Sequence, residues 1–315
     1  MRLSHWILSV LLCCISFTAS AQKKISYRFA TRAEAQMLIT DIDNFTNRLN
    51  SFDINLRLGK ENGRKSELLR LAMNETLNWS ETEKKKITAA FKSLQAKIDK
   101  QKLKIKYPQE VILVKTSMKE EMNVAAYTRR NWIALGEKYI NESTPESLEY
   151  LLAHEMFHLL TRSNKDFKKS VYSVIGFNVI DRELFFPIDI IEKRISNPDI
   201  EMYDSYAEFT INGQKQKCSM MIYSAIPFSA EKTLSDYLSV GLIPLNESLI
   251  PLQENGQTVI YSIDQAEDFY QKIGKNTEYI INPEEILADN FAYLVTQKKN
   301  LPNPEIIQKI AAILK

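Results

Sequence analysis

The chain has 315 residues, of which 44% are hydrophobic and 25% are charged, a composition typical of globular proteins. This length allows one large domain or two modest ones. The formal net charge of +2 and the pI near 8.2 give no reason to expect nucleic acid or an acidic membrane surface as a partner.

The first residues have the pattern of a secretory signal peptide. Arg2 provides a positive start, an apolar run covers residues 6–17, and small residues at positions 19–21 form a cleavage site. The apolar run is too short for a permanent membrane-spanning helix, and no second run of spanning length follows. We therefore expect residues 1–21 to be removed, leaving an exported protein, periplasmic or secreted, without a membrane span.

Cysteine usage limits the chemistry of the mature chain. Cys13 and Cys14 lie within the predicted signal peptide, so the mature chain keeps Cys218. A lone cysteine forms no intrachain disulfide, and a cysteine-ligated metal site is not expected. We interpret Cys218, which lies among methionines, as a core residue rather than a nucleophile.

Residues 22–102 are predicted to form a helical N-terminal lobe. Apolar residues recur at helical spacing over residues 31–50 and 63–79. A capping box at Ser80 and Glu83 predicts a third helix that runs to about Gln101. No residue in this lobe suggests a chemical role, so we interpret it as a scaffold or as a lid over a cleft.

The periodicity then changes to that of strands. Leu103, Ile105 and Tyr107 alternate with lysines, and an apolar run begins at Val111. Residues 123–128 and 132–135 flank a polar turn and predict a β-hairpin. The hairpin strand is predicted to be either an ordinary sheet strand or the cleft edge to which an extended peptide adds.

The next segment contains the sequence HEMFH, at His154, Glu155 and His158. Thr144 followed by Pro145 is a good helix start, and the many leucines that follow predict a buried helix. On a helix, residues four apart share a face, so both imidazoles can bind one ion. This is the HExxH pattern of zinc sites, with a glutamate placed to take a proton from water at the metal. The alternative is a pair of ordinary core or surface histidines.

Residues 165–279 form a long segment of mixed character. We predict a helix over 172–180, strands over 206–211 and 218–225, and a helix near 264–273. This segment has no repeats and no low-complexity linker, so we treat it as an insertion in one domain. It also contains the candidates for stabilising an oxyanion, among which we select Tyr206 as the catalytic one: Tyr203, Tyr206, Tyr223 and Arg194.

The third metal ligand is predicted to be a carboxylate or, less usually, an amide or a tyrosine, because the remaining histidine lies in the signal peptide. Asn282 followed by proline predicts a helix start, and Glu285 and Asp289 then share one helix face. Capping accounts for Glu284 and could account for Glu285, but it leaves Asp289 unexplained. We select Glu285 as the ligand, with Glu284 as the alternative, and Asp289 as an acceptor that orients a metal-bound histidine ring.

The motif HEMFH followed by Glu285-x-x-x-Asp289 resembles the HExxH…ExxxD pattern of gluzincin metallopeptidases, the thermolysin-like class. The string PEEILADNFA also resembles the corresponding segment of exported bacterial proteins of this type. The resemblance implies His154, His158 and Glu285 as Zn²⁺ ligands, Glu155 as general base, and Asp289 behind His154.

This resemblance covers two short stretches, and the chain departs from the family in two ways. His158 and Glu285 are 127 positions apart (285 − 158), far more than in thermolysin-like enzymes. No further histidine is available as an acid, so a tyrosine or an arginine would have to replace it.

The predicted fold is α+β, with a zincin-like catalytic domain over residues 103–315 that carries a small mixed sheet. The predicted function is zinc-dependent hydrolysis of peptide bonds outside the cytoplasm, with a peptide or protein as substrate. Two alternatives stay open: a non-catalytic protein with a structural zinc, and an amidase acting on cell-wall peptides. The sequence contains no indication of the oligomeric state.

Overall fold

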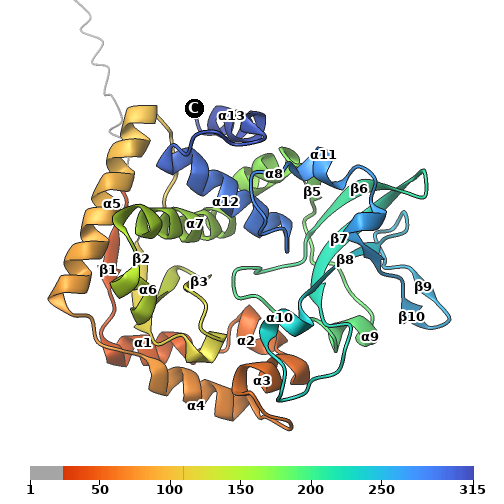
Figure 1. The fold of residues 1–315 in the computed structure, drawn as a ribbon, viewed down its shortest axis with the longest axis horizontal. Helices are drawn as coiled ribbons and strands as arrows, with labels where there is room; N and C mark the ends of the chain where they lie inside the picture. The colour runs from red at the N-terminus through yellow and green to blue at the C-terminus, as the bar shows by residue number, and fades with distance from the viewer. Residues whose placement is uncertain (1–23, 109) are drawn as a thin grey trace, which may run out of the picture.

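The computed structural model describes residues 24–108 and 110–315, so the predicted signal peptide lies outside the described residues. The chain mixes α-helices with two main small sheets (Figure 1). Among the described residues, no helix is both long and apolar enough to span a membrane.

The N-terminal part is mostly helical, with one strand before the helices. The predicted helix over 31–50 is wrong as a single helix: it stops at Ile39, and Asp43 and Asn50 cap two new helices with their side chains. The capping box at Ser80 is confirmed. The elements are β1 (Tyr27–Phe29), α1 (Arg32–Ile39), α2 (Asn44–Arg48), α3 (Ser51–Leu58), α4 (Lys65–Glu75) and α5 (Glu81–Gln101).

The first sheet has four strands in the order β1-β2-β4-β3. β2 (Val111–Thr116) pairs in parallel with β1 and β4 (Trp132–Gly136), whereas β3 (Ala126–Arg129) is antiparallel to β4. The predicted hairpin is thus confirmed, and β3 is an edge strand. β1 lies before position 102 and β2 after it, so this sheet includes residues from both sides of the predicted lobe boundary.

The strand predicted from Leu103 to Tyr107 is not formed. These three residues are buried and the lysines between them are exposed, as the alternation predicts. However, the structure forms no strand over residues 103–107, where the amide of Lys104 donates to the carbonyl of Leu314. Alternation of apolar and polar residues indicates that one face of an extended segment is buried and the other is exposed. It does not require that the segment pair with a strand.

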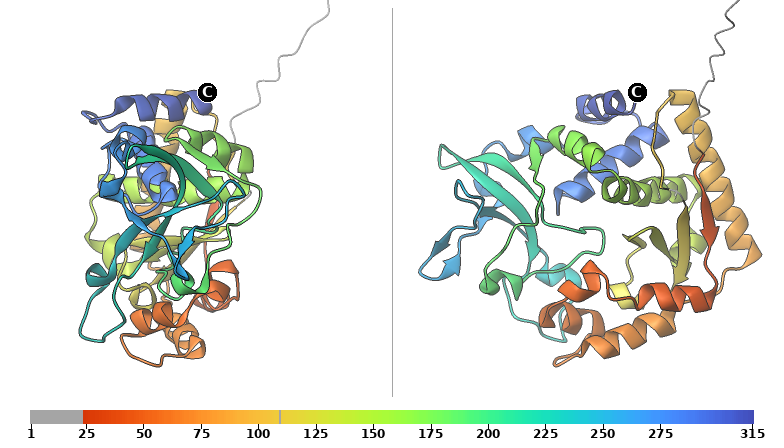
Figure 2. Two further views of the ribbon diagram at one scale, coloured as in Figure 1. Left: turned by 90° about the vertical axis from the view of Figure 1, so that its right-hand side faces the viewer. Right: turned by 180° about the vertical axis from the view of Figure 1, so that it is seen from behind.

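A layer of helices lies over the first sheet and contains the HEMFH segment. α7 (Pro145–Ser163) begins at Thr144, whose hydroxyl accepts from the amide of Ser147, as predicted. α7 packs against α5 on one side and α12 (Pro283–Thr296) on the other (Figures 1 and 2). The remaining elements of this half are η1 (Lys119–Glu121), α6 (Glu137–Glu142), α8 (Lys165–Ser173) and α13 (Pro304–Ile313).

The second sheet is antiparallel, with the order β11-β8-β7-β6-β5. The predicted strands near 206–211 and 218–225 are confirmed, but the predicted helix over 172–180 ends at Ser173 and is followed by a strand. The elements are β5 (Phe177–Val179), α9 (Ile188–Ile191), β6 (Ser205–Ile211), β7 (Gln214–Tyr223), α10 (Leu234–Tyr237), β8 (Ser239–Pro244), β9 (Gln253–Glu254), β10 (Gln257–Thr258), β11 (Tyr261–Ser262), η2 (Ile263–Gln265) and α11 (Phe269–Ile273).

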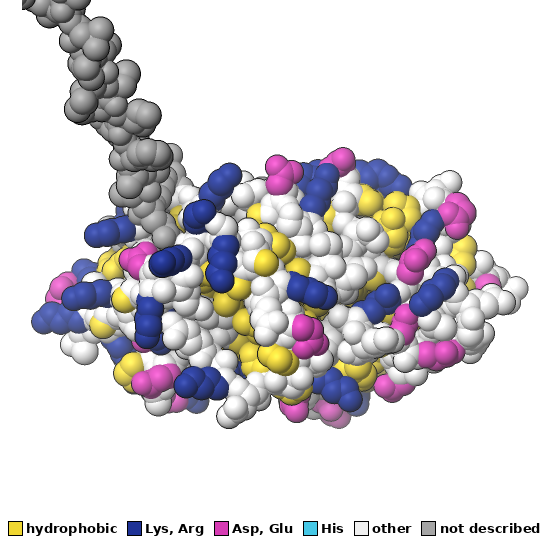
Figure 3. Space-filling model, turned by 90° about the horizontal axis from the view of Figure 1, so that it is seen from above, with side chains coloured by type: hydrophobic (Ala, Val, Ile, Leu, Met, Phe, Trp, Pro, Cys, Tyr) yellow, Lys and Arg dark blue, Asp and Glu magenta, His cyan; other side chains and the backbone are white. Residues whose placement is uncertain are grey.

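One hydrophobic core joins the half of the fold that contains the first sheet to the half that contains the second sheet. It includes α5, α7 and α12 and extends to Phe177, Phe209 and Cys218 on the second sheet. Cys218 is fully buried, in agreement with its prediction as a core residue. The surface shown in Figure 3 mixes lysine and arginine with acidic side chains, and no histidine is visible on that face.

A buried ion cluster connects α3 to the loop before β6. The Arg57 guanidinium lies 2.8 Å from Glu121 Oε2 and 3.4 Å from Asp53 Oδ1. It also donates to the carbonyl of Ser196 at 2.7 Å, and Asp53 accepts from the Ser196 amide and hydroxyl. The cluster therefore fixes the position of a loop that reaches the site described below.

We predict that Arg57→Met lowers the free energy of unfolding by about 3–5 kcal/mol, because it leaves two buried carboxylates without their cation. Urea unfolding of the variant and the wild-type chain measures this. Lys60→Met is the control, since the pair of Lys60 with Glu67 is exposed and its loss is expected to cost less than about 0.5 kcal/mol. Equal losses in the two variants would contradict the structural role of the cluster.

Candidate metal centre

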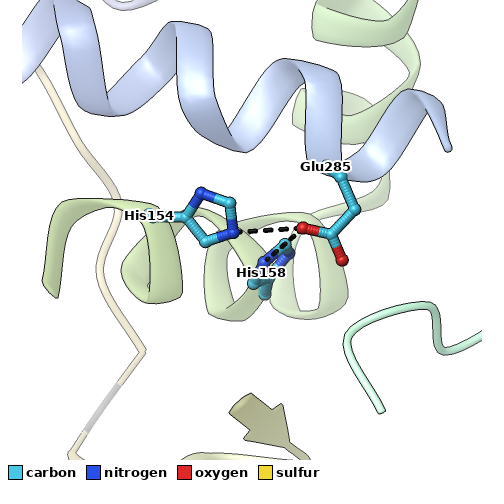
Figure 4. Close-up of side chains that lie close together, drawn as sticks. All are labelled: His154, His158 and Glu285. Carbon is cyan, nitrogen blue, oxygen red and sulfur yellow. Dashed lines mark hydrogen bonds and ion pairs between the residues drawn. The ribbon is translucent and has the colours of Figure 1, made fainter. Parts of the chain in front are cut away.

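Helices α7 and α12 bring three potential metal ligands together. His154 Nε2 lies 3.1 Å from Glu285 Oε2, and His158 Nε2 lies 3.7 Å from the same oxygen. Figure 4 shows both rings on α7 directed toward the Glu285 carboxylate on α12. The 127-residue separation in sequence is thus bridged by direct helix packing, and these three residues form a group able to hold a metal ion.

The other ring nitrogen of each histidine contacts a carboxylate from α12. Asp289 Oδ1 lies 2.9 Å from His154 Nδ1, and Glu284 Oε1 lies 3.0 Å from His158 Nδ1. A carboxylate partner favours the tautomer with its proton on Nδ1, which leaves the Nε2 lone pair free for a metal. Sequence analysis placed Asp289 behind His154, but it assigned Glu284 to capping or to a third ligand, and here Glu284 lies behind His158.

These two orienting carboxylates are themselves held by hydroxyl groups. Burial and the nearby Glu284 charge raise the pKa of Tyr172 well above its usual value, so its hydroxyl is protonated and donates. The four donors are Tyr172 and Thr161 to Glu284, and Tyr150 and Thr277 to Asp289. The ring orientations are consequently fixed by a layer of side chains behind the site.

The residues at this site fit a cation. His158 is fully buried, and its Nε2 atom has no hydrogen-bond partner. A buried polar atom without a partner is costly, and a metal ion would satisfy it. Around the two rings lie five buried carboxylates, those of Glu155, Asp199, Glu284, Glu285 and Asp289. So many desolvated negative charges also require positive charge between them.

Glu155 lies in the same space on the side of β3. Its side chain is 2% exposed, and its Oε2 atom accepts from the Thr128 hydroxyl at 2.6 Å. Burial raises the pKa of the Glu155 carboxyl above its usual value. A buried carboxyl whose pKa is raised is a stronger base than an exposed one, which suits it to accepting a proton.

Two further residues at the site come from the segment between α9 and β6. Asn197 donates from Nδ2 to Glu285 Oε1 at 2.6 Å, and Asp199 Oδ1 lies 4.0 Å from His158 Nε2. Asp199, Glu155 and His158 form a second group able to hold a metal ion. Sequence analysis missed both residues, because Asn197-Pro198 has the pattern of a turn and no local periodicity shows what a turn contacts.

The structure places Tyr206 on β6, where it is partly buried and faces the charge of Lys217. Among residues 24–108 and 110–315, no hydrogen bond, ion pair or ring contact joins Tyr206 to the histidines or Glu285. Tyr203 instead packs against Arg194, 5.8 Å from the ring centre, and Arg194 forms a β-bridge with Tyr223. In the described part of the chain, none of the four oxyanion candidates thus has a hydrogen bond, ion pair or ring contact with the candidate metal ligands.

Tyr279 lies beside the site and was not among the sequence candidates. It is 44% exposed to solvent. Its ring centre lies 6.4 Å from that of His154. Partial burial and the charges of Glu285, Asp199 and Glu155 hold its pKa well above the usual value, so its hydroxyl can donate. Its position in the sequence could have indicated this contact. Tyr279 lies three residues before Asn282, the cap of the helix that carries Glu285, and the loop that leads into such a helix also lies near the site.

Comparisons with known proteins identify no relative. No protein-family model, no curated protein and no solved structure matches this chain.

We predict that Tyr172→Phe lowers the free energy of unfolding by about 1.5–3 kcal/mol, because a buried hydrogen bond to a charged carboxylate is lost. Urea unfolding in the presence of a chelator measures this without a contribution from metal. Tyr107→Phe is the matched control, since the Tyr107 hydroxyl is buried without a partner and its removal should be neutral or slightly stabilising. A neutral Tyr172→Phe would show that this hydroxyl does not hold Glu284.

Proposed function

We propose that this chain is an exported zinc-dependent peptidase of the gluzincin type, with a zincin-like catalytic domain. The observation that carries the proposal is the unpartnered, fully buried Nε2 atom of His158, which faces Glu285 beside His154 and Glu155. The HExxH pattern and the resemblance to gluzincins support the same assignment.

The donor set favours zinc among the common cations. Two imidazoles, which are neutral when they bind a metal, and one carboxylate match the His₂Glu ligands of catalytic zinc sites. Calcium and magnesium prefer oxygen ligands alone, and the two Nε2 atoms are poor donors for them. His154, His158 and Glu285 would hold the ion, and Asp289 and Glu284 would orient the two rings.

Glu155 is the proposed general base. When bound, zinc supplies a Lewis acid that polarises the scissile carbonyl and lowers the pKa of a bound water. Glu155 would accept a proton from the attacking water and deliver it to the amine that leaves when the C–N bond breaks. The hydrogen bond from Thr128 holds the Glu155 carboxylate on the side of β3 during both transfers.

Edge strand β3 and Tyr279 support binding of an extended peptide. Gly136 donates to the carbonyl of Ala125, and alternation along the ladder then directs the Thr128 amide away from β4, to the free edge of the sheet. A substrate strand can pair with that edge. We propose Tyr279, in place of Tyr206, as the donor to the developing oxyanion, because it lies beside His154.

A specific observation favours one competing function, a structural zinc site. Structural sites have four protein ligands, whereas catalytic sites keep one position for water. Asp199 is the fourth candidate ligand, since its Oδ1 atom is 4.0 Å from His158 Nε2. A cell-wall peptide amidase would use the same ligands, and only its substrate would differ.

We predict about one zinc per chain for purified residues 22–315, measured by elemental mass spectrometry after dialysis. Glu285→Ala should lose most of this zinc, because a carboxylate ligand of the ion is removed. The matched control is Glu278→Ala, an exposed glutamate a few residues upstream, which should keep the wild-type content. A wild-type chain that takes up no zinc even when zinc is supplied would refute the proposed function.

We predict that Glu155→Gln keeps its zinc and loses hydrolysis by about 10²–10⁴-fold, the contribution of a general base. Glutamine preserves the volume of the side chain and an oxygen that accepts from Thr128, so the loss reports on the proton transfer. Turnover of casein and of a cell-wall peptide preparation should be measured in parallel, which also separates a peptidase from an amidase. Unchanged turnover in the variant would overturn the role of Glu155.

A further inference from the structure

The segment Ser196–Glu201, here called the closing segment, joins α9 to β6 and extends away from the second sheet toward β3 (Figure 1). The amide of Thr128 on β3 donates to Asp199 Oδ1 at 2.6 Å, so this approach is a direct contact. The closing segment therefore crosses from one half of the fold to the candidate metal centre in the other.

Both ends of the closing segment are held by the N-terminal helices. Asp53 and Arg57 on α3 bind the backbone of Ser196, as described above. At the other end, Arg48 donates to the carbonyl oxygens of residues 200 and 201, at 3.3 and 2.6 Å. The three residues between these anchors, Asn197 to Asp199, form a tip whose contacts are with the site.

The tip contacts the metal ligands and the helix that carries them. Asn197 holds Glu285 Oε1, the carboxylate oxygen that does not face His154. Arg162, one turn beyond His158 on α7, donates to the carbonyl oxygens of Pro198 and Asp199 at 2.9 and 3.0 Å. These contacts place the side chain of Asp199, which is 8% exposed, against the unpartnered Nε2 atom of His158.

Asp199 also occupies the place where an extended substrate would pair with β3. The Thr128 amide faces the free edge of the sheet, and the Asp199 carboxylate already accepts from it. An incoming peptide carbonyl would need that same donor. The Asp199 carboxylate thus accepts from the amide that a substrate would need, and it also lies 4.0 Å from His158, one of the proposed metal ligands.

We propose that Asp199 is a fourth protein ligand of the same metal, and that the closing segment holds the site in a latent state. This inference rests on the proposed function. Asp199 takes the coordination position that an active zinc site keeps for water. Displacement of the tip opens that position and frees the edge of β3, so activity depends on the fraction of chains in which the tip is displaced.

The surroundings of the tip leave room for this displacement. A cavity of about 390 Å³ lies beside Pro198 and is lined by Arg129, Arg130 and Arg162. A second cavity, of about 130 Å³, is lined by Asp199 and Glu284. The tip therefore borders two spaces, whereas the backbone on either side of it is held by Arg57 and Arg48.

Binding of acetohydroxamate, a small chelator of zinc, to the zinc-loaded chain tests the proposal. Calorimetry should show binding at least about tenfold tighter to Asp199→Asn than to wild type, because the apparent affinity equals the intrinsic affinity multiplied by the fraction of open sites, which is small in wild type. Asparagine keeps an acceptor for the Thr128 amide and removes the charge that competes for the metal. Asp181→Asn, a change at an exposed aspartate paired with lysines, should bind like wild type.

A second variant leaves the Asp199 carboxylate in place. Arg162→Met removes the two hydrogen bonds that hold the tip, so it should also tighten acetohydroxamate binding. Both variants should keep about one zinc per chain, and hydrolysis of casein or cell-wall peptides should increase in parallel with chelator affinity. The parallel increase distinguishes release of the tip from a local change in charge.

Three results would overturn the proposal. Equal chelator affinity in wild type and Asp199→Asn would show that Asp199 does not occupy the position. Loss of zinc from Asp199→Asn would show a four-ligand structural site instead. Tighter chelator binding with lower hydrolysis would make Asp199 a positioning residue of an open site. Absence of zinc from the wild-type chain is a different failure, because it refutes the proposed function itself and this inference with it.

Discussion

The structure depends on how a group of buried carboxylates is compensated at the contact between α7 and α12. Five acids and two imidazoles share this interior space, and Arg162 and Lys168 are the basic side chains whose charges act on it. Desolvation makes such an excess of negative charge costly. A divalent ion held by the two Nε2 atoms and Glu285 would offset that cost and would satisfy the unpartnered nitrogen of His158. The metal would then be a folding partner as well as a chemical one.

The rest of the fold keeps those groups in place. Most of α7 is buried, and its leucines pack against α5 and α12, so the helix cannot rotate its histidines toward solvent. Tyr150 and Tyr172, on α7 and α8, fix the orienting carboxylates from behind. The four-stranded sheet contributes its edge strand, whose Thr128 bonds the general-base candidate with its hydroxyl and Asp199 with its amide.

The N-terminal helices have a closer relation to the site than a peripheral scaffold or lid. Arg48, Asp53 and Arg57 hold the two ends of the closing segment, and the tip between them reaches His158 and Glu285. A change in how α2 and α3 pack would therefore be transmitted to the metal centre through one short segment. Under the proposal, this gives the N-terminal helices a role in access to the site, although no hydrogen bond, ion pair or ring contact joins residues 24–102 to His154, His158 or Glu285.

Sequence alone determined the local features. The helix starts at Thr144, Ser80 and Asn282, the hairpin of β3 and β4, the His154/His158 pair and the Glu285/Asp289 pair all follow from capping, periodicity and spacing. These depend on residues a few positions apart, where the chain geometry is set by the helix or strand itself.

Only the tertiary structure decided which distant residues meet. Glu284 contacts His158 Nδ1, Asn197 and Asp199 reach the candidate ligands, and Tyr279 rather than Tyr206 lies beside His154. Leu103, Ile105 and Tyr107 are buried in a segment that is not a strand. Each of these outcomes depends on packing between segments far apart in sequence. An acid near a helix start, a turn before a proline and an alternating run have the same local pattern whether they face solvent, a ligand or the core, because burial is a property of the assembled fold.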